Sequence, residues 1–159
     1  MRSSEASWEA APPERAPVSA RHREPAGRVA GGGKRIRVLL VDDHVIVRQG
    51  LVRLLNAESD LEVVGEASDG KEAVGLTRRL QPDLVIMDVS LRDMTGVEAS
   101  RAIRAEFPSV QVIGLSMYDE AEEGAAMREA GAVDYLSKLG PSEALLTAIR
   151  SCIRSPRPR

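Results

Sequence analysis

Short apolar runs alternate along the chain with segments whose apolar positions recur every three or four residues. Five runs predict strands, at residues 36–43, 61–66, 84–88, 110–116 and 133–137. The Val, Ile and Leu content of the first and third is typical of strands covered on both faces. Between and after the strands, helical spacing predicts helices, for example through apolar positions 47, 51, 54 and 55. The pattern therefore predicts five strands and five helices in strict alternation.

Local signals mark where these helices begin and end. Three starts have the spacing of a capping box, in which a cap residue stands three positions before a glutamate: Asp69 with Glu72, Thr95 with Glu98, and Asp119 with Glu122. Pro82 and Pro108 stop helices, and Pro141 suits the first turn of the last one, which carries apolar positions 145, 146, 149, 152 and 153. Strict alternation implies right-handed crossovers, so we expect an α/β fold with a single doubly wound parallel sheet.

Two of the buried strands end on carboxylates. Asp42 and Asp43 follow the first apolar run, and Asp88 ends the third. Open α/β sheets place their ligand sites at the carboxyl ends of strands, so these acids should lie together. Several negative charges at one place are unfavourable unless a cation is shared among them. The loops after the fourth and fifth strands add Ser116 and Lys138 to the same edge.

These residue types favour phosphoryl transfer over nucleotide binding. Neither a Gly-x-Gly-x-x-Gly turn nor a Walker-type Gly-x-x-x-x-Gly-Lys sequence occurs. Two acids could hold Mg²⁺, while Asp88 attacks phosphorus and Lys138 holds the transferred group as a point charge. Ser116 supplies a hydroxyl. We therefore expect a site that accepts a phosphoryl group.

Charge and composition divide the chain into a tail and a domain. Residues 1–35 hold seven Lys/Arg and four Glu, a net charge of +3, and their prolines and glycines predict a disordered N-terminal tail. Residues 36–159 hold fifteen Lys/Arg and twenty Asp/Glu, a net charge of −5, which argues against direct nucleic-acid binding. No run is long enough to span a membrane, and the single Cys152 fits a cytoplasmic protein and the core of the last helix.

Four motifs in order carry a resemblance to a known family. They are Ile36-Arg-Val-Leu-Leu-Val-Asp-Asp-His44, Pro82-Asp-Leu-Val-Ile-Met-Asp88, Leu115-Ser-Met-Tyr118 and Gly131-Ala-Val-Asp-Tyr-Leu-Ser-Lys138. With separations of 45, 28 and 22 residues from Asp43 through Asp88 and Ser116 to Lys138, they resemble the receiver domain of two-component response regulators, most closely the NarL/FixJ subfamily. The resemblance implies a flavodoxin-like receiver domain over residues 36–153 with strand order 2-1-3-4-5.

The resemblance also implies a role for each motif residue. Asp88 matches the acid that receives phosphate from a sensor histidine kinase and becomes an aspartyl phosphate. The Mg²⁺ ligands would be Asp42, Asp43, Asp88 and the backbone carbonyl of Ser90. Lys138 would pair with a phosphoryl oxygen, and Ser116 and Tyr135 would form a switch that is read out on the fourth helix, fifth strand and fifth helix.

Several points stay open at this stage. Residues 154–159 read as a short basic tail without an output domain, so the chain is expected not to read DNA itself, and a homodimer or a downstream protein partner would receive the signal. The alternatives are a fragment of a DNA-binding regulator and a binding module that is never phosphorylated. An enzyme is not expected, because a hydrolase would need a general acid where Ser90 stands. His44 is expected to start a helix rather than bind metal, and Arg92 replaces a proline that many relatives carry.

Overall fold

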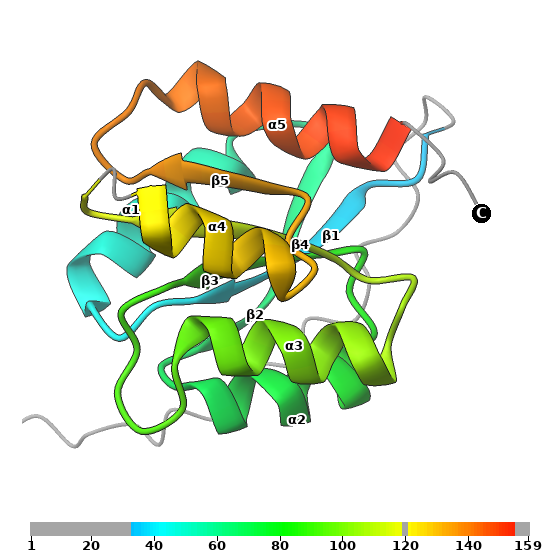
Figure 1. Ribbon diagram of the computed structural model, residues 1–159. Coiled ribbons are helices and arrows are strands. Elements are labelled where there is room, and N and C mark those ends of the chain that lie inside the picture. Colours follow the sequence, from blue (N-terminus) through cyan, green and yellow to red (C-terminus); the bar gives the residue numbers. More distant parts are fainter. Residues whose placement is uncertain (1–32, 119–120, 155–159) are drawn as a thin grey trace, which may run out of the picture. The chain divides into compact units, whose positions relative to one another are not determined.

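The computed structural model describes residues 33–118 and 121–154, which form a five-stranded parallel sheet with helices on both faces (Figure 1). The elements, in chain order, are β1 (Ile36–Val41), α1 (Val45–Asn56), β2 (Leu61–Ala67), α2 (Gly70–Leu80), β3 (Leu84–Asp88), α3 (Gly96–Glu106), β4 (Gln111–Ser116), α4 (Ala121–Glu129), β5 (Asp134–Ser137) and α5 (Ser142–Arg154). The strand order is β2-β1-β3-β4-β5. The predicted fold class and strand order are confirmed.

Most predicted boundaries agree with the structure to within one or two residues. The largest difference matters for the site, because β1 ends at Val41 and leaves Asp42 and Asp43 in the loop before α1. The backbone turns there, and Asp42 Oδ1 accepts a hydrogen bond of 2.8 Å from the His44 amide, as aspartate often does at a turn. The regular strand therefore ends before the acids, although the Asp42 amide still donates to the Ala67 carbonyl of β2 at 3.0 Å.

The helix starts follow the predicted capping pattern with one variation. Thr95 and Glu98 form the full reciprocal capping box. Asp69 accepts from the Glu72 amide at 2.8 Å, but the Glu72 carboxylate accepts from the Ser68 amide instead of from Asp69. The predicted cap Asp119 lies outside the described residues, as do residues 1–32 and 155–159 of the two predicted tails.

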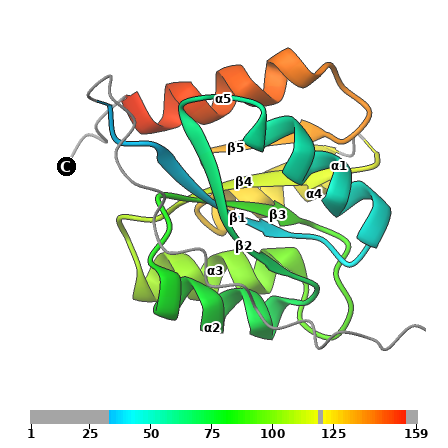
Figure 2. The same cartoon turned by 180° about the vertical axis from the view of Figure 1, so that it is seen from behind.

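Two apolar cores hold the helices against the sheet. On one face, β-strand residues such as Leu39, Val85 and Val112 pack with side chains from α2, α3 and α4. On the other face, residues such as Leu40 and Ile86 pack with side chains from α1 and α5. Figures 1 and 2 show α1 and α5 on one side of the sheet and α2 and α3 on the other. Strands buried on both faces explain the continuous apolar runs of the sequence.

No helix within residues 33–118 and 121–154 is long and apolar enough to cross a membrane.

Candidate functional site

The strand register places four of the predicted site residues at one edge of the sheet. Val41 pairs with Met87 and Asp88 pairs with Leu115, so Asp42 and Asp88 lie level with each other. Ser116 pairs with Ser137, and the Lys138 amide donates to the Ser116 carbonyl at 2.7 Å. Parallel pairing of these strands therefore brings together residues that are up to 96 positions apart in the sequence.

The centre of the site is a buried lysine between two buried carboxylates. Lys138 Nζ lies 2.6 Å from Asp42 Oδ2 and 3.1 Å from Asp88 Oδ2. All three side chains are at most 4% exposed. A buried ion needs close partners because it has lost its hydration. One ammonium group cannot balance Asp42, Asp43 and Asp88 together, so the cluster keeps an excess of negative charge.

Three buried carboxylate oxygens of this cluster make no hydrogen bond of regular geometry among the described residues. Asp42 Oδ2 and Asp88 Oδ2 both face the single Lys138 ammonium group, and Asp43 Oδ1 lies beside the His44 ring. One ligand atom each from Asp42, Asp43, His44 and Asp88 lies within 4.8 Å of the others. Carboxylate oxygens are the ligands that hard divalent cations prefer. The donor set therefore fits Mg²⁺, because three neighbouring carboxylates share one ammonium group.

His44 lies closer to this cluster than the sequence suggested. It caps α1, as predicted for a residue at a helix start. Its Nδ1 atom is also 3.0 Å from Asp43 Oδ1 and 3.2 Å from Asp42 Oδ1. The sequence could not show this contact, because the direction of the ring depends on how the loop turns after β1.

Burial raises the pKa of the Asp88 carboxyl above its usual range. The Ser90 amide, which donates to Asp88 Oδ1 at 3.0 Å, and the Lys138 charge act in the opposite direction, while the Asp42 charge raises the pKa further. The Ser90 amide thus steers one oxygen of Asp88, and the other faces Lys138. The predicted contribution of the Ser90 carbonyl to a metal site stays a prediction.

The loop after β3 is held close to Asp88 by a glycine that the sequence analysis did not single out. A Cβ atom on Gly96 would lie 2.2 Å from the Asp88 carbonyl oxygen and 2.8 Å from the Val89 Cα. The Gly96 amide donates to the Val89 carbonyl at 3.2 Å. Only glycine permits this approach of α3 to the backbone of the acid. A glycine directly after the capping threonine was the available signal.

Arg48 and Arg92 lie on either side of the acids. Arg48 Nη1 donates to the Asp42 carbonyl at 2.6 Å, and its Nε donates to Glu66, so it ties α1 to the end of β1. Arg92 Nε lies 3.9 Å from Asp43 Oδ2, but its side chain is 90% exposed. Arg92 therefore adds an exposed positive charge beside the site.

Ser116 and Tyr135 meet at a carboxylate from α4. The Ser116 hydroxyl donates to Glu123 Oε2 at 3.0 Å, and the Tyr135 hydroxyl lies 3.1 Å from the same oxygen. The Tyr135 ring is close to two glycines, since a Cβ atom on Gly114 or Gly124 would lie 3.1 or 3.0 Å from it. The glycine in α4 therefore makes room for Tyr135. Sequence analysis joined Ser116 and Tyr135 but gave no part to Glu123.

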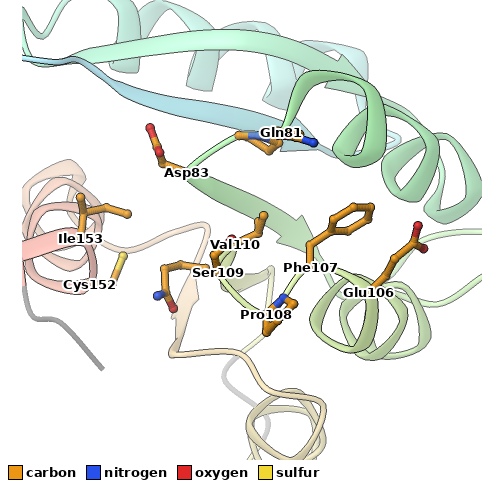
Figure 3. Close-up of a pocket in the computed structure, with 11 residues that line it drawn as sticks. Gln81, Asp83, Glu106, Phe107, Pro108, Ser109, Val110, Cys152 and Ile153 are labelled. Atoms are coloured by element: carbon orange, nitrogen blue, oxygen red, sulfur yellow. The ribbon is translucent and has the colours of Figure 1, made fainter. Parts of the chain in front are cut away.

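A second hollow lies at the opposite, amino edge of the sheet (Figure 3). This cavity of about 640 Å³ is lined by residues that include Asp83, Phe107, Gln111 and Cys152. Asp83 accepts from the Arg37 amide at 2.9 Å, and burial raises the pKa of the Cys152 thiol to about 11. The cavity therefore lacks the buried cluster of charges found at the carboxyl edge.

The parallel sheet thus brings residues of the four motifs together, with Lys138 buried between Asp42 and Asp88. The family model of the response regulator receiver domain matches residues 38–150, and the chain belongs to this family. The expected resemblance is therefore confirmed, including its NarL/FixJ-like character.

Two curated relatives and one solved structure show how far the similarity extends. The chain is 42% identical over 116 residues to the transcriptional regulatory protein LiaR of Bacillus subtilis, covering 73% of this chain and 55% of LiaR. It is 40% identical over 119 residues to the response regulator VraR of Staphylococcus aureus, covering 75% and 57%. The signal receiver domain of the response regulator NarL from Mycobacterium tuberculosis superposes with a TM-score of 0.73 at 29% identity, covering 77% and 99%. The chain thus spans little more than half the length of these curated relatives.

Proposed function

We propose that this chain accepts a phosphoryl group from a sensor histidine kinase onto Asp88 and passes on the signal through the surface of α4, β5 and α5. The observation that carries the proposal is the position of Lys138 Nζ between Asp42 Oδ2 and Asp88 Oδ2 in a nearly fully buried site. An ion pair with structural value alone has no need of a second carboxylate on the same lysine or of a third, Asp43, beside them. Three carboxylates that share one ammonium group suit a divalent cation and a phosphoryl group.

Each residue has a specific task in this transfer. The Asp88 carboxylate attacks phosphorus, a phosphorus–oxygen bond forms, and the phosphorus–nitrogen bond to the kinase histidine breaks with its electron pair returning to the imidazole. Lys138 pairs with a phosphoryl oxygen, and the Ser116 hydroxyl donates to another. Asp42, Asp43, Asp88 and the Ser90 carbonyl would hold Mg²⁺, which when bound neutralises negative charge on the phosphoryl oxygens.

The proposal makes the chain a switch and places it in the cytoplasm, where a kinase is charged by ATP. The receiver family is one of signal transducers, and the two aligned relatives are named as a transcriptional regulatory protein and a response regulator. We extend that role here: phosphorylation would change how this surface binds a second copy of the chain or a downstream protein.

Phosphorylation by a small donor tests the function directly. Incubation with phosphoramidate or acetyl phosphate and Mg²⁺ should add the mass of one phosphoryl group, and Asp88→Asn should abolish the addition. Asp83→Asn, which removes a carboxylate at the opposite edge, should be labelled like the wild type. Unchanged labelling of Asp88→Asn, or a wild type that accepts no phosphoryl group from any donor, would overturn the proposal and favour a protein-binding module.

A further inference from the structure

Glu123 joins the two switch residues in a contact that the receiver mechanism does not require. Its Oε2 atom accepts from Ser116 Oγ at 3.0 Å and lies 3.1 Å from the Tyr135 hydroxyl. Ser116 is on β4, Tyr135 is on β5 and Glu123 is in the first turn of α4. One carboxylate oxygen therefore links three neighbouring elements directly beside the phosphoryl-accepting site.

The Ser116 hydroxyl can donate only one hydrogen bond, so it can bind only one acceptor at a time. A serine hydroxyl has one proton to donate. In the structure that proton goes to Glu123, while the oxygen accepts from the Tyr118 amide at 3.1 Å. If the hydroxyl is to donate to a phosphoryl oxygen on Asp88, it must leave Glu123. The two acceptors therefore compete for the same proton.

We propose that Glu123 is a positioning residue that holds the Ser116 hydroxyl on α4 and that phosphorylation of Asp88 must displace it. This inference rests on the proposed function. When the Ser116 hydroxyl donates to the phosphoryl group instead of to the Glu123 carboxylate, the proton stays on Ser116 Oγ and the link between β4 and α4 is broken. The Tyr135 hydroxyl, which lies 3.1 Å from Glu123 Oε2 and 3.2 Å from the Tyr118 carbonyl oxygen, then no longer shares Glu123 with Ser116, so the change at Asp88 reaches α4 and the Tyr135 side chain together.

The first turn of α4 is suited to such a displacement. Within α4 only Gly124 and Met127 are buried, whereas α2 buries three residues and α3 buries four. Its start is therefore held by polar contacts more than by a continuous apolar stripe, and Figure 1 shows the helix beside β5. Loss of a carboxylate contact is more readily transmitted by an element with little apolar burial.

Binding of beryllofluoride, a phosphoryl mimic, in the presence of Mg²⁺ measures the competition. Glu123→Ala removes a contact made only in the unphosphorylated state, so its affinity for the mimic should rise about 3- to 10-fold over the wild type, the range for loss of one charge-assisted hydrogen bond partly replaced by water. Glu123→Gln keeps the shape and loses the charge, and should show a smaller rise. Glu122→Ala removes an exposed acid from the same turn and should bind like the wild type.

A double-mutant cycle separates positioning from a general effect on the helix. In a Ser116→Ala background, Glu123→Ala should leave the affinity unchanged, because the competing proton is gone. A second readout is the Tyr135 ring resonance in NMR spectra. Without beryllofluoride, Glu123→Ala should shift this resonance toward its position in the beryllofluoride-bound wild type.

The outcomes distinguish this inference from the proposed function. A wild type that binds beryllofluoride, with Glu123→Ala at the same affinity, overturns the role of Glu123 alone. So does an equal rise in the Ser116→Ala background or in Glu122→Ala. A wild type that neither binds beryllofluoride nor accepts a phosphoryl group overturns the proposed function and this inference with it.

Discussion

At the amino edge of the sheet, Arg150 of α5 lies 2.8 Å from Asp60 Oδ1 and 2.7 Å from Glu58 Oε2, with side chains that are 28–40% exposed. At the carboxyl edge, Lys138 lies as close to Asp42 and Asp88, with side chains that are 2–4% exposed. The distances are similar, but water reaches only the first group. Water screens and solvates the amino-edge charges, so they fasten α5 at little cost in free energy.

This difference in burial indicates that the two charged groups have different roles. A buried pair recovers its desolvation free energy only when its charges are matched and its acceptors are well donated to, and at the carboxyl edge one ammonium group serves two buried carboxylates beside a third, Asp43. An arrangement that does not favour stability is retained for a ligand. We read the carboxyl edge as a site prepared for added charge, and the amino edge as a fastening between α5 and the loop before β2.

The largest effect should come from removing the buried cation. Lys138→Met leaves Asp42 and Asp88 buried without their counter-charge, and we expect the free energy of unfolding at neutral pH to fall by about 3 kcal/mol, as for other broken buried pairs. Chemical denaturation in the absence of divalent cations measures this loss. The matched change at the amino edge, Arg150→Met, should lower the free energy of unfolding less. An equal loss for the two variants would mean that the two charged groups do not differ in their burial cost.

A smaller effect should come from adding a cation instead. A ligand that binds only the native state stabilises it by mass action, so Mg²⁺ at ten times its dissociation constant should add about 1.4 kcal/mol and raise the melting temperature by a few degrees. Asp43→Asn should abolish the rise, because it removes the charge of one of the carboxylates that would hold the ion. Asp60→Asn should keep it. A rise that persists in Asp43→Asn would place the Mg²⁺ elsewhere.

Sequence analysis predicted the order and type of the ten elements because burial on both faces leaves continuous apolar strands and because caps are local. It placed Asp88 correctly at the end of its strand, while β1 ended two residues before the predicted Asp43. Turn geometry decides such an end, and the hydrophobic pattern does not report it. Strand-end position also indicated that Asp42, Asp88 and Lys138 would meet.

Contacts that depend on the direction of side chains could not be predicted. Glu123 stood in the sequence only as part of an acidic first turn, and its approach to Ser116 and Tyr135 depends on how α4 lies beside β5. The same holds for the ring of His44 beside Asp43. The need for glycine at position 96 could not be predicted either, because it depends on how closely α3 approaches the Asp88 carbonyl.

The smallest predicted effect concerns pH. The contributions of the two edges to the free energy of unfolding should change in opposite directions as the pH rises. Hydrogen bonding to Arg150 lowers the pKa of Asp60 from its ordinary 3.8, so the stability it contributes is present above that value and is lost as the pH falls. Burial raises the pKa of Asp88 above 3.8, so its contribution is present at low pH and is lost as the pH rises through the folded-state pKa. As the pH rises, the contribution of Asp60 to stability therefore increases while that of Asp88 decreases.

Replacing each aspartate by uncharged asparagine separates the contributions of Asp88 and Asp60 to stability, when the free energy of unfolding is measured against pH in the presence of a chelator. Asp88→Asn should gain stability relative to the wild type as the pH rises from 4 to 7, because the wild type must then carry a buried charge that the variant lacks. Asp60→Asn should lose stability relative to the wild type over the lower part of that range, because the wild type then gains its ion pair with Arg150. Parallel curves for Asp88→Asn and the wild type would mean that water reaches Asp88 as freely as it reaches Asp60, and the carboxyl edge would then not be the charged, dry site that phosphoryl transfer requires.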